Sequence, residues 1–260
     1  MNILDKIVLR KKEEIALAKQ QVSIQQLEKQ AHFGRSTYNF KDFLLAADRT
    51  GIIAEYKRRS PSKGIINGNA TVEMVTTAYN AAGASALSVL TDTDFFGGKA
   101  DDLIQARAVN QIPILRKDFM IDEYQLLEAK AWGADIILLI AAILSPKEID
   151  QLAATAKGLG LNVLLEVHDQ KELERSLSPN LSAIGVNNRN LGDFTVNIQT
   201  SFELADQIPN DFLKISESAI DNPAVIRELK SAGYQGFLIG ENFMKTNDPG
   251  QAMAAFVSAL

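Results

Sequence analysis

The chain has 260 residues, of which 46% are hydrophobic and 23% are charged, a composition typical of a globular protein that can bury a large core. It contains no cysteine, which excludes disulfides, cysteine-ligated metal centres and thiol nucleophiles. The formal net charge of −5 argues against non-specific nucleic-acid binding, but it leaves room for a local basic pocket that binds an anionic ligand.

The N-terminal region has no targeting pattern and a helical composition. Residues 1–6 lack the apolar core of a secretory signal, and no apolar run approaches the roughly 20 residues that a membrane span needs. We therefore expect a cytoplasmic protein that does not contact a membrane. Apolar residues among Lys, Arg and Glu, without Gly or Pro, predict a helix over residues 3–20. A weaker helix is predicted over 24–30, and a short apolar segment follows at 40–44.

From residue 52 onward, eight apolar, β-rich runs alternate with eight helical stretches. The runs lie at residues 52–56, 86–90, 112–115, 135–140, 162–166, 183–186, 212–216 and 237–239. The helical stretches lie at residues 71–82, 101–110, 122–132, 146–159, 170–177, 198–208, 223–232 and 249–260. Strands that alternate with helices imply a parallel sheet with right-handed crossovers, and eight such units predict a closed (β/α)8 barrel, also called a TIM barrel.

Residues at the ends of the predicted helices support this division. Ser145, followed by Pro146 and Glu148, forms a capping box with proline in the first turn. Glycines typical of left-handed helix ends follow four of the helices, at Gly83, Gly133, Gly160 and Gly233.

The main alternative is an open doubly wound sheet, which should carry a glycine-rich phosphate turn after its first strand. Here the first strand is followed by Lys57-Arg58-Arg59-Ser60-Pro61-Ser62, which contains no glycine. We therefore predict a single barrel domain over residues 1–260. Residues 49–260 form the barrel, and residues 1–48 form a helical extension that we expect to cover the bottom of the barrel.

Titratable side chains stand at the ends of three predicted strands, where (β/α)8 barrels carry out their chemistry. They are Glu55, Lys117 and Glu166. Because side chains alternate between the two faces of a strand, all three can point into the barrel, whereas Arg116 and Val167 then face the helices. A partly desolvated lysine can have a lowered pKa and act as a general acid or form a Schiff base, and glutamates can transfer protons. The alternatives are a solvated charge at the rim or a structural Glu–Lys pair.

The last two strand ends offer a phosphate site, because barrels often hold a phosphate there with backbone N–H groups and a helix N-terminus. The candidates are Ser218, Ala219, Gly240 and Glu241, with Lys57 as a counter-charge. Gly240 permits close approach of the backbone to a ligand, although it can equally serve only to make a tight turn.

Other loop residues suggest a pocket for an aromatic acid. Arg189 has a planar fork suited to a carboxylate, and Asn187 adds neutral donors and acceptors. Aromatic side chains that could line a ring pocket, or simply pack in the core, are Phe95, Phe96 and Phe119. The loop over residues 60–64 could be a mobile flap.

The two histidines are weak signals. We expect His32 to be exposed in a polar connector. His168 has the parity to face Glu166, but we expect it to cap the next helix rather than to act in catalysis. With two histidines and no cysteine, we expect no dedicated metal site.

Several motifs in order resemble indole-3-glycerol phosphate synthase, and the similarity spans nearly the whole chain. They are Glu55-Tyr56-Lys57, Ser60-Pro61-Ser62-Lys63-Gly64, Leu115-Arg116-Lys117-Asp118-Phe119, Leu165-Glu166-Val167-His168, Gly185-Val186-Asn187-Asn188-Arg189 and Ser216-Glu217-Ser218. The resemblance implies a (β/α)8 barrel with extra N-terminal helices and a role in tryptophan biosynthesis. The substrate would be 1-(2-carboxyphenylamino)-1-deoxyribulose 5-phosphate, whose pyrrole ring closes with loss of CO2 and water.

The resemblance also implies residue roles. Lys117 would be the general acid at the substrate carbonyl, Glu55 and Glu166 would handle later proton transfers, and Lys57 would contact substrate and assist. Asn187, Arg189 and Glu217 would hold the anthranilate part and the ribulose hydroxyls, and Ser60 and Phe119 would shape the pocket. The phosphate would lie against Ser218, Ala219, Gly240 and Glu241. No cofactor is implied, and we expect a monomer.

Two departures from the family pattern concern the phosphate site. Ala219 replaces the usual glycine, and alanine has fewer accessible backbone conformations than glycine. Asn242 stands where a serine is common. The rival functions are another sugar-phosphate barrel enzyme, such as a phosphoribosylanthranilate isomerase or a Schiff-base aldolase, and a non-catalytic phosphate-binding barrel.

Overall fold

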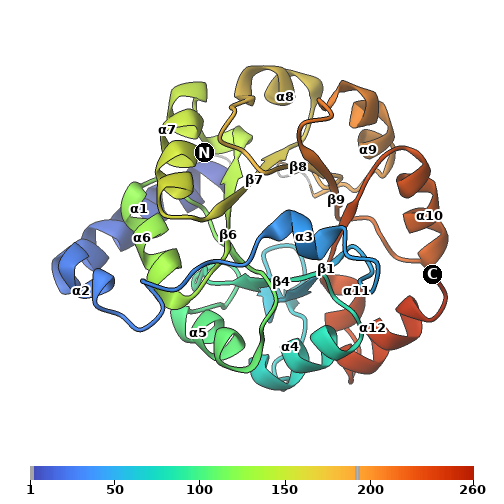
Figure 1. Ribbon diagram of the computed structural model, residues 1–260, viewed down its shortest axis with the longest axis horizontal. Helices are drawn as coiled ribbons and strands as arrows, with labels where there is room; N and C mark the ends of the chain where they lie inside the picture. Colours follow the sequence, from blue (N-terminus) through green and yellow to red (C-terminus); the bar gives the residue numbers. More distant parts are fainter. Residues whose placement is uncertain (1–2, 191, 193) are drawn as a thin grey trace.

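Eight parallel strands close into a barrel in the computed structural model, which describes residues 3–190, 192 and 194–260 (Figure 1). β1 pairs with both β4 and β10, and this pairing closes the sheet. The barrel strands are β1 (Ile52–Tyr56), β4 (Ala86–Leu90), β5 (Ile114–Lys117), β6 (Ile136–Ile140), β7 (Asn162–Val167), β8 (Ala183–Asn187), β9 (Leu213–Glu217) and β10 (Gly236–Ile239). The predicted (β/α)8 barrel is confirmed.

Helices surround the barrel, one after each strand (Figure 1). They are α4 (Val72–Ala81), α5 (Ala100–Val109), α6 (Glu123–Trp132), α7 (Pro146–Gly158), α8 (Gln170–Ser176), α9 (Gln199–Leu204), α10 (Pro223–Ser231) and α12 (Pro249–Val257). The predicted capping box at Ser145 is present, and all four predicted glycines have a positive φ. The sequence did not indicate two short elements, η1 (Ala141–Ile143) and α11 (Glu241–Met244); η2 (Ala205–Gln207) falls within the helical stretch predicted over residues 198–208.

The apolar core has two layers. Ile53, Leu115 and Leu164 belong to the cluster inside the barrel, as strand parity predicts. Val167 belongs to the cluster between the strands and the helices. The guanidinium of Arg116 also lies in the outer layer, 4.0 Å from the centre of a tryptophan ring of α6. Parity therefore assigned these side chains to the correct faces.

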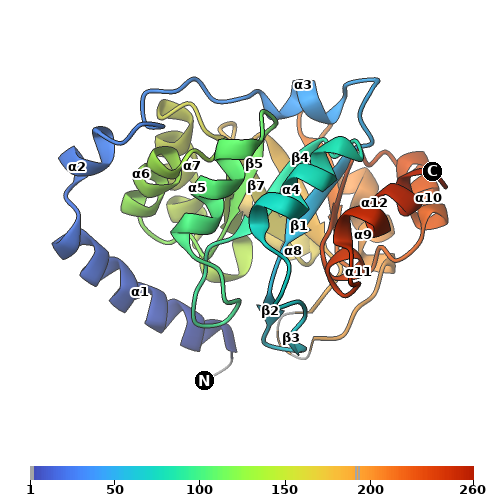
Figure 2. The same ribbon diagram turned by 90° about the horizontal axis from the view of Figure 1, so that it is seen from below.

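The N-terminal segment covers both ends of the barrel rather than only the bottom. It forms α1 (Ile3–Gln21), α2 (Ile24–Glu28) and α3 (Phe40–Leu44). α3 packs against residues inside the bottom of the barrel, as expected, but α1 lies at the opposite end (Figure 2). The prediction is wrong for α1, because its buried face includes Lys11, which forms ion pairs with carboxylates that follow β4 and β5.

A small hairpin follows β1 on the same side of the barrel as α1 (Figure 2). Its strands are β2 (Arg59–Ser60) and β3 (Gly64–Ile65), paired antiparallel. The sequence predicted only a loop here. Among the described residues, no helix has the length and apolar character needed to cross a membrane.

Candidate active site

An ion cluster lies at the carboxyl end of the barrel, around the ammonium group of Lys117. Its Nζ is 2.9 Å from Oε2 of Glu166 and 2.7 Å from Oε2 of Glu217. Both glutamates are buried. The lysine ends β5, Glu166 lies near the end of β7, and Glu217 ends β9. One cation thus contacts two acidic side chains inside the barrel.

The fourth member of this group is Glu55 on β1. β1, β5, β7 and β9 are alternate strands of the barrel, and alternate strands supply the side chains of one interior layer. Glu55 Oε1 is 2.6 Å from Nζ of Lys57, so Glu55 pairs with this second lysine. The predicted convergence of Glu55, Lys117 and Glu166 therefore needs an addition: Glu217, expected only as a substrate contact, directly contacts Lys117.

The neighbouring charges set the protonation states of this cluster. Burial lowers the pKa of Lys117, but Glu166, Glu217 and Glu55 raise it more strongly, so the net shift is upward. A lowered pKa, one possibility that the sequence left open for this lysine, is not found, because three carboxylates surround the amine. Lys117 is an ammonium ion, which suits a proton donor better than a free amine nucleophile.

The two acidic partners of Lys117 differ from each other. Burial raises the pKa of Glu166, but Lys117 and His168 lower it, and the net shift is downward. Burial, reinforced by the charge of Glu166, raises the pKa of Glu217 to about 7 despite Lys117. Neighbouring carboxyl groups with separated pKa values are typical of acid–base sites.

A cavity of about 140 Å³ opens above the ion cluster. Ser60, Phe96 and Phe119 line it, and the two aromatic rings have centroids 6.0 Å apart. Phe95, a predicted substrate contact, is not among the lining residues; it packs against the interior apolar cluster. The predicted site residues that the structure brings to this cavity are Glu55, Lys57, Ser60, Lys117, Phe119, Glu166, Asn187, Arg189, Glu217, Ser218 and Glu241.

A second cavity of about 190 Å³ adjoins the first and shares several lining residues with it. The predicted phosphate residues Ser218, Ala219, Gly240 and Glu241 all line it. Ser218 and Ala219 have φ angles of 66° and 61°, a left-handed conformation that costs roughly 1–2 kcal/mol for a residue other than glycine. Within the described part of the chain, the backbone N–H groups of these two residues have no hydrogen-bond acceptor.

Arg189 lines both cavities, and Asn187 lines the first. A guanidinium nitrogen of Arg189 is 3.4 Å from Oε2 of Glu241. Asn187 Oδ1 accepts hydrogen bonds from the Arg189 backbone N–H (3.0 Å) and from the Ser218 hydroxyl (2.9 Å). These contacts tie the loop after β8 to the loop after β9. Among the described residues, no group of three or more His, Asp or Glu side chains is arranged to hold a metal ion.

Comparison with known proteins matches this chain to one family over nearly its whole length. The family model described as indole-3-glycerol phosphate synthase covers residues 4–256. The chain belongs to this family. A relative of that name from Bacteroides thetaiotaomicron is 48% identical over 259 residues, with 100% of this chain and 99% of the relative covered. Another from Bordetella pertussis is 42% identical over 260 residues, with 99% of both covered.

Solved structures with low sequence identity share the fold with this synthase-family chain. A mandelate oxidase variant aligns with a TM-score of 0.59 at 13% identity, over 81% of this chain and 72% of the other. A native KDPGal structure aligns with a TM-score of 0.56 at 15% identity, over 81% of this chain and 92% of the other. These likenesses support the barrel fold alone.

Two glycines make room for acidic side chains of the synthase-family site. A Cβ on Gly185 would lie 2.2 Å from Oε1 of Glu217, and one on Gly240 would lie 2.4 Å from Oε1 of Glu55. Gly240 therefore has a packing role that the sequence did not indicate, besides its place at the second cavity.

Gly185→Ala should displace Glu217 from Lys117 and reduce kcat/KM by about tenfold or more, with about 1–3 kcal/mol lost from the free energy of unfolding through overpacking. Steady-state kinetics and urea unfolding would measure the two effects. Gly158→Ala is the matched control, because a Cβ there meets nothing within 4 Å. Unchanged kinetics in the Gly185 variant would contradict this reading of the site.

Lys11 is a residue beside this site that the sequence analysis missed. Its buried Nζ is 2.9 Å from Asp92, 3.0 Å from Asp118 and 2.7 Å from Glu14. Asp118 directly follows Lys117, so the contact ties α1 to the segment that carries the central cation. A signal was present in the sequence, because Lys11 falls at helical spacing between Ile7 and Ile15, on the buried face of α1.

Proposed function

We propose that this chain is an indole-3-glycerol phosphate synthase, which closes the pyrrole ring of 1-(2-carboxyphenylamino)-1-deoxyribulose 5-phosphate with loss of CO2 and water. The observation that carries the proposal is Lys117, held as an ammonium ion between Glu166 and Glu217 in a cavity at the carboxyl end of the barrel. Family membership supplies the reaction, and this cluster supplies the acid–base groups that the reaction needs.

Lys117 acts first, as the general acid at the substrate carbonyl. When the aromatic carbon attacks this carbonyl, negative charge develops on the oxygen, and a proton from Nζ lowers the barrier. The raised pKa of Lys117, which Glu166 and Glu217 produce against the effect of burial, keeps that proton in place until the substrate needs it.

The later steps need a proton for the departing hydroxyl and a base for a C–H proton. Glu55 and Glu166 are the proposed carriers, and Lys57 assists from beside Glu55, 2.6 Å away. The Glu55–Lys57 pair faces both cavities, which puts it between the ring-closure site and the phosphate end of the substrate. All of the proposed proton transfers fall to side chains, so the chemistry needs no cofactor.

The second cavity is the proposed phosphate site. Ser218 and Ala219 present successive backbone N–H groups there, and Gly240 beside them is the N-cap of short α11. The left-handed backbone of both residues supports this assignment, because strained backbone outside glycine is often kept for function. Arg189, which lines both cavities, and Asn187, which lines the first, hold the anthranilate part and the ribulose hydroxyls, and Phe119 and Ser60 shape the ring pocket.

The decisive experiment mixes purified protein with the carboxyphenylamino substrate and follows the appearance of indole fluorescence. We expect stoichiometric formation of indole-3-glycerol phosphate and CO2. Two outcomes would favour a rival enzyme: turnover of phosphoribosylanthranilate instead, or borohydride trapping of an imine at Lys117 with a carbonyl substrate. Absence of turnover with all these substrates would favour a non-catalytic phosphate-binding barrel.

A further inference from the structure

The proposed reaction consumes one proton from solvent in each turnover. The carbonyl oxygen leaves as water and so acquires two protons, whereas the methylene carbon beside the nitrogen releases only one when the pyrrole ring forms. The substrate carboxylate leaves as neutral CO2, and its electron pair restores the aromatic ring. The site must therefore take up one proton from solvent in each cycle, and Lys117 must be protonated again before the next one.

A row of titratable side chains leads from Lys117 to another part of the molecule. Glu166 contacts Lys117 through Oε2, at 2.9 Å, while its other oxygen, Oε1, lies 3.4 Å from Nε2 of His168. On the far side of the ring, Nδ1 of His168 lies 3.0 Å from Oε2 of Glu172. One carboxylate thus lies between the lysine and the histidine, and the histidine lies between two carboxylates.

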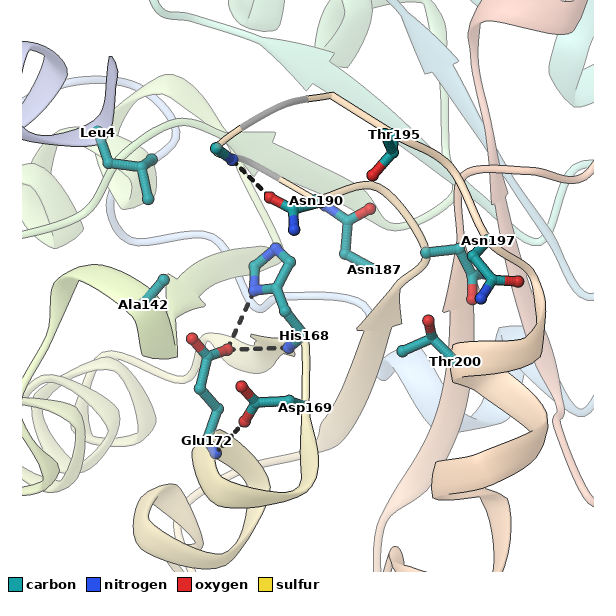
Figure 3. A pocket seen from close by; sticks show the side chains of 12 residues that line it. Leu4, Ala142, His168, Asp169, Glu172, Asn187, Asn190, Thr195, Asn197 and Thr200 are labelled. Carbon is teal, nitrogen blue, oxygen red and sulfur yellow. Dashed lines mark hydrogen bonds and ion pairs between the residues drawn. The ribbon is translucent and has the colours of Figure 1, made fainter. Parts of the chain in front are cut away.

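The far end of this row lines a polar pocket of about 570 Å³, which shares Asn187 with the first of the two cavities described above (Figure 3). The His168 ring and the Glu172 carboxylate lie together at its wall, and Asp169 lies close by (Figure 3). Most of the remaining lining side chains are amides and hydroxyls. Glu166 is buried and does not line this pocket, but its contact with His168 joins the buried carboxylate to the pocket.

We propose that His168 is a positioning residue that returns the consumed proton to Lys117 through Glu166. His168 then regains a proton from solvent in the polar pocket. This inference rests on the proposed function. It gives a role to a histidine whose Nε2 has no hydrogen-bond partner among the described residues, although it faces Glu166. The 3.4 Å separation is longer than a hydrogen bond, and contacts of this kind in free enzymes often tighten when substrate binds.

The charges around His168 keep it protonated at neutral pH. Burial lowers its pKa, but Glu166 from β7 and Glu172 from α8 raise it to about 10. Asp169, the N-cap of α8, adds a further negative charge at the pocket, and Lys117 is the only cation paired with Glu166 besides the imidazolium among the described residues. A proton is therefore stored next to Glu166 before each turnover.

Lys117 gives its proton to the substrate oxygen and becomes a neutral amine, which removes a positive charge from beside Glu166. The Nε2–H bond of His168 breaks, and the proton joins Oε1 of Glu166. After rotation about Cγ–Cδ, the carboxylic acid passes the proton to Nζ of Lys117. The neutral imidazole keeps its Nδ1–H, so its bare Nε2 must turn toward the pocket, take up a proton from solvent there and turn back to Glu166.

The test compares wild-type protein, His168→Gln and the control His32→Gln, which replaces the only other histidine, partly buried in the connector after α2. Glutamine can hold Glu166 by a hydrogen bond but carries no exchangeable charge. We expect kcat of His168→Gln to fall by about 10–100-fold, with KM within about threefold of wild type. Imidazole and amine buffers should restore kcat as their concentration rises, whereas wild type and His32→Gln should not respond.

Two results would overturn the inference while leaving the synthase activity intact. One is a kcat of His168→Gln within twofold of wild type at every pH. The other is a reduced kcat that no buffer restores, since His168 would then only hold Glu166 in place. If His168→Gln does not fold, Glu172→Gln serves instead: losing this carboxylate lowers the pKa of His168, so the alkaline fall of kcat should move to lower pH. An unmoved profile would contradict the relay, and inactive wild-type protein would contradict the proposed function itself.

Discussion

Replacing Lys117 by alanine should reduce kcat by about 10³-fold while the barrel stays folded. The variant lacks the proton donor for the carbonyl oxygen, and Glu166 and Glu217 lose the cation that they share. We expect folding to survive, because two neighbouring buried carboxyl groups can hold one proton between them. Indole fluorescence under saturating substrate measures the rate, and circular dichroism checks the fold.

The matched control for this variant is Lys147→Ala, an exposed lysine on α7, which should leave kcat unchanged. A kcat of Lys117→Ala within tenfold of wild type would remove the central assignment, since another group would then protonate the carbonyl. A variant that is inactive because it has unfolded would show a lost circular dichroism signal and would count against the expected independence of catalysis and fold.

Lys11→Met should lower the free energy of unfolding by about 3–5 kcal/mol, because it leaves two buried carboxylates without their shared cation. Those carboxylates are Asp92 and Asp118, both almost fully buried. Methionine keeps the length and apolar stem of the lysine, so the decrease in the free energy of unfolding comes mainly from removal of the ammonium charge. Urea unfolding near neutral pH measures it, with Lys12→Met as an exposed control that should change stability by less than about 0.5 kcal/mol.

The effect of Lys11→Met should depend on pH. Burial raises the pKa of Asp118, but Lys11 and Arg116 bring it down to about 2, below the ordinary value of 3.8. A carboxyl group whose pKa is depressed by folding stabilises the folded state above its unfolded pKa, and this contribution disappears as the pH falls through the folded pKa. The gap between wild type and variant should therefore be full above about pH 4 and narrow toward pH 2. A gap that stays constant would exclude Asp118 as its source.

The sequence was a good guide to the barrel because the local signals agree with one another. The apolar runs, helix caps and left-handed glycines each involve residues close together in the chain. They can therefore be predicted from the sequence alone. The start of β5 shows the limit of such signals: the predicted run began at residue 112, but Pro113 has no N–H for the sheet, and the strand runs from Ile114 to Lys117.

Part of the site could be predicted from the sequence for the same reason. Strand parity placed Glu55, Lys117 and Glu166 on the inner face, and the same rule applied to Leu213, Ile215 and Glu217 would have added the fourth acid. The direction in which the pKa of Lys117 is shifted could not be predicted from the sequence. It depends on how many carboxylates surround the amine, and these come from strands as far as 100 residues away in the chain.

The sequence by itself determined the order of strands and helices, the inward face of each strand and the family, because these follow from local periodicity and ordered motifs. Only the tertiary structure decided that α1 covers the carboxyl end of the barrel, that Lys117 contacts Glu166 and Glu217 while Glu55 pairs with Lys57, and that His168 joins the buried cluster to a polar pocket. The physical reason is that charge pairing acts through space: its strength depends on distances of about 3 Å between side chains that sequence order does not relate.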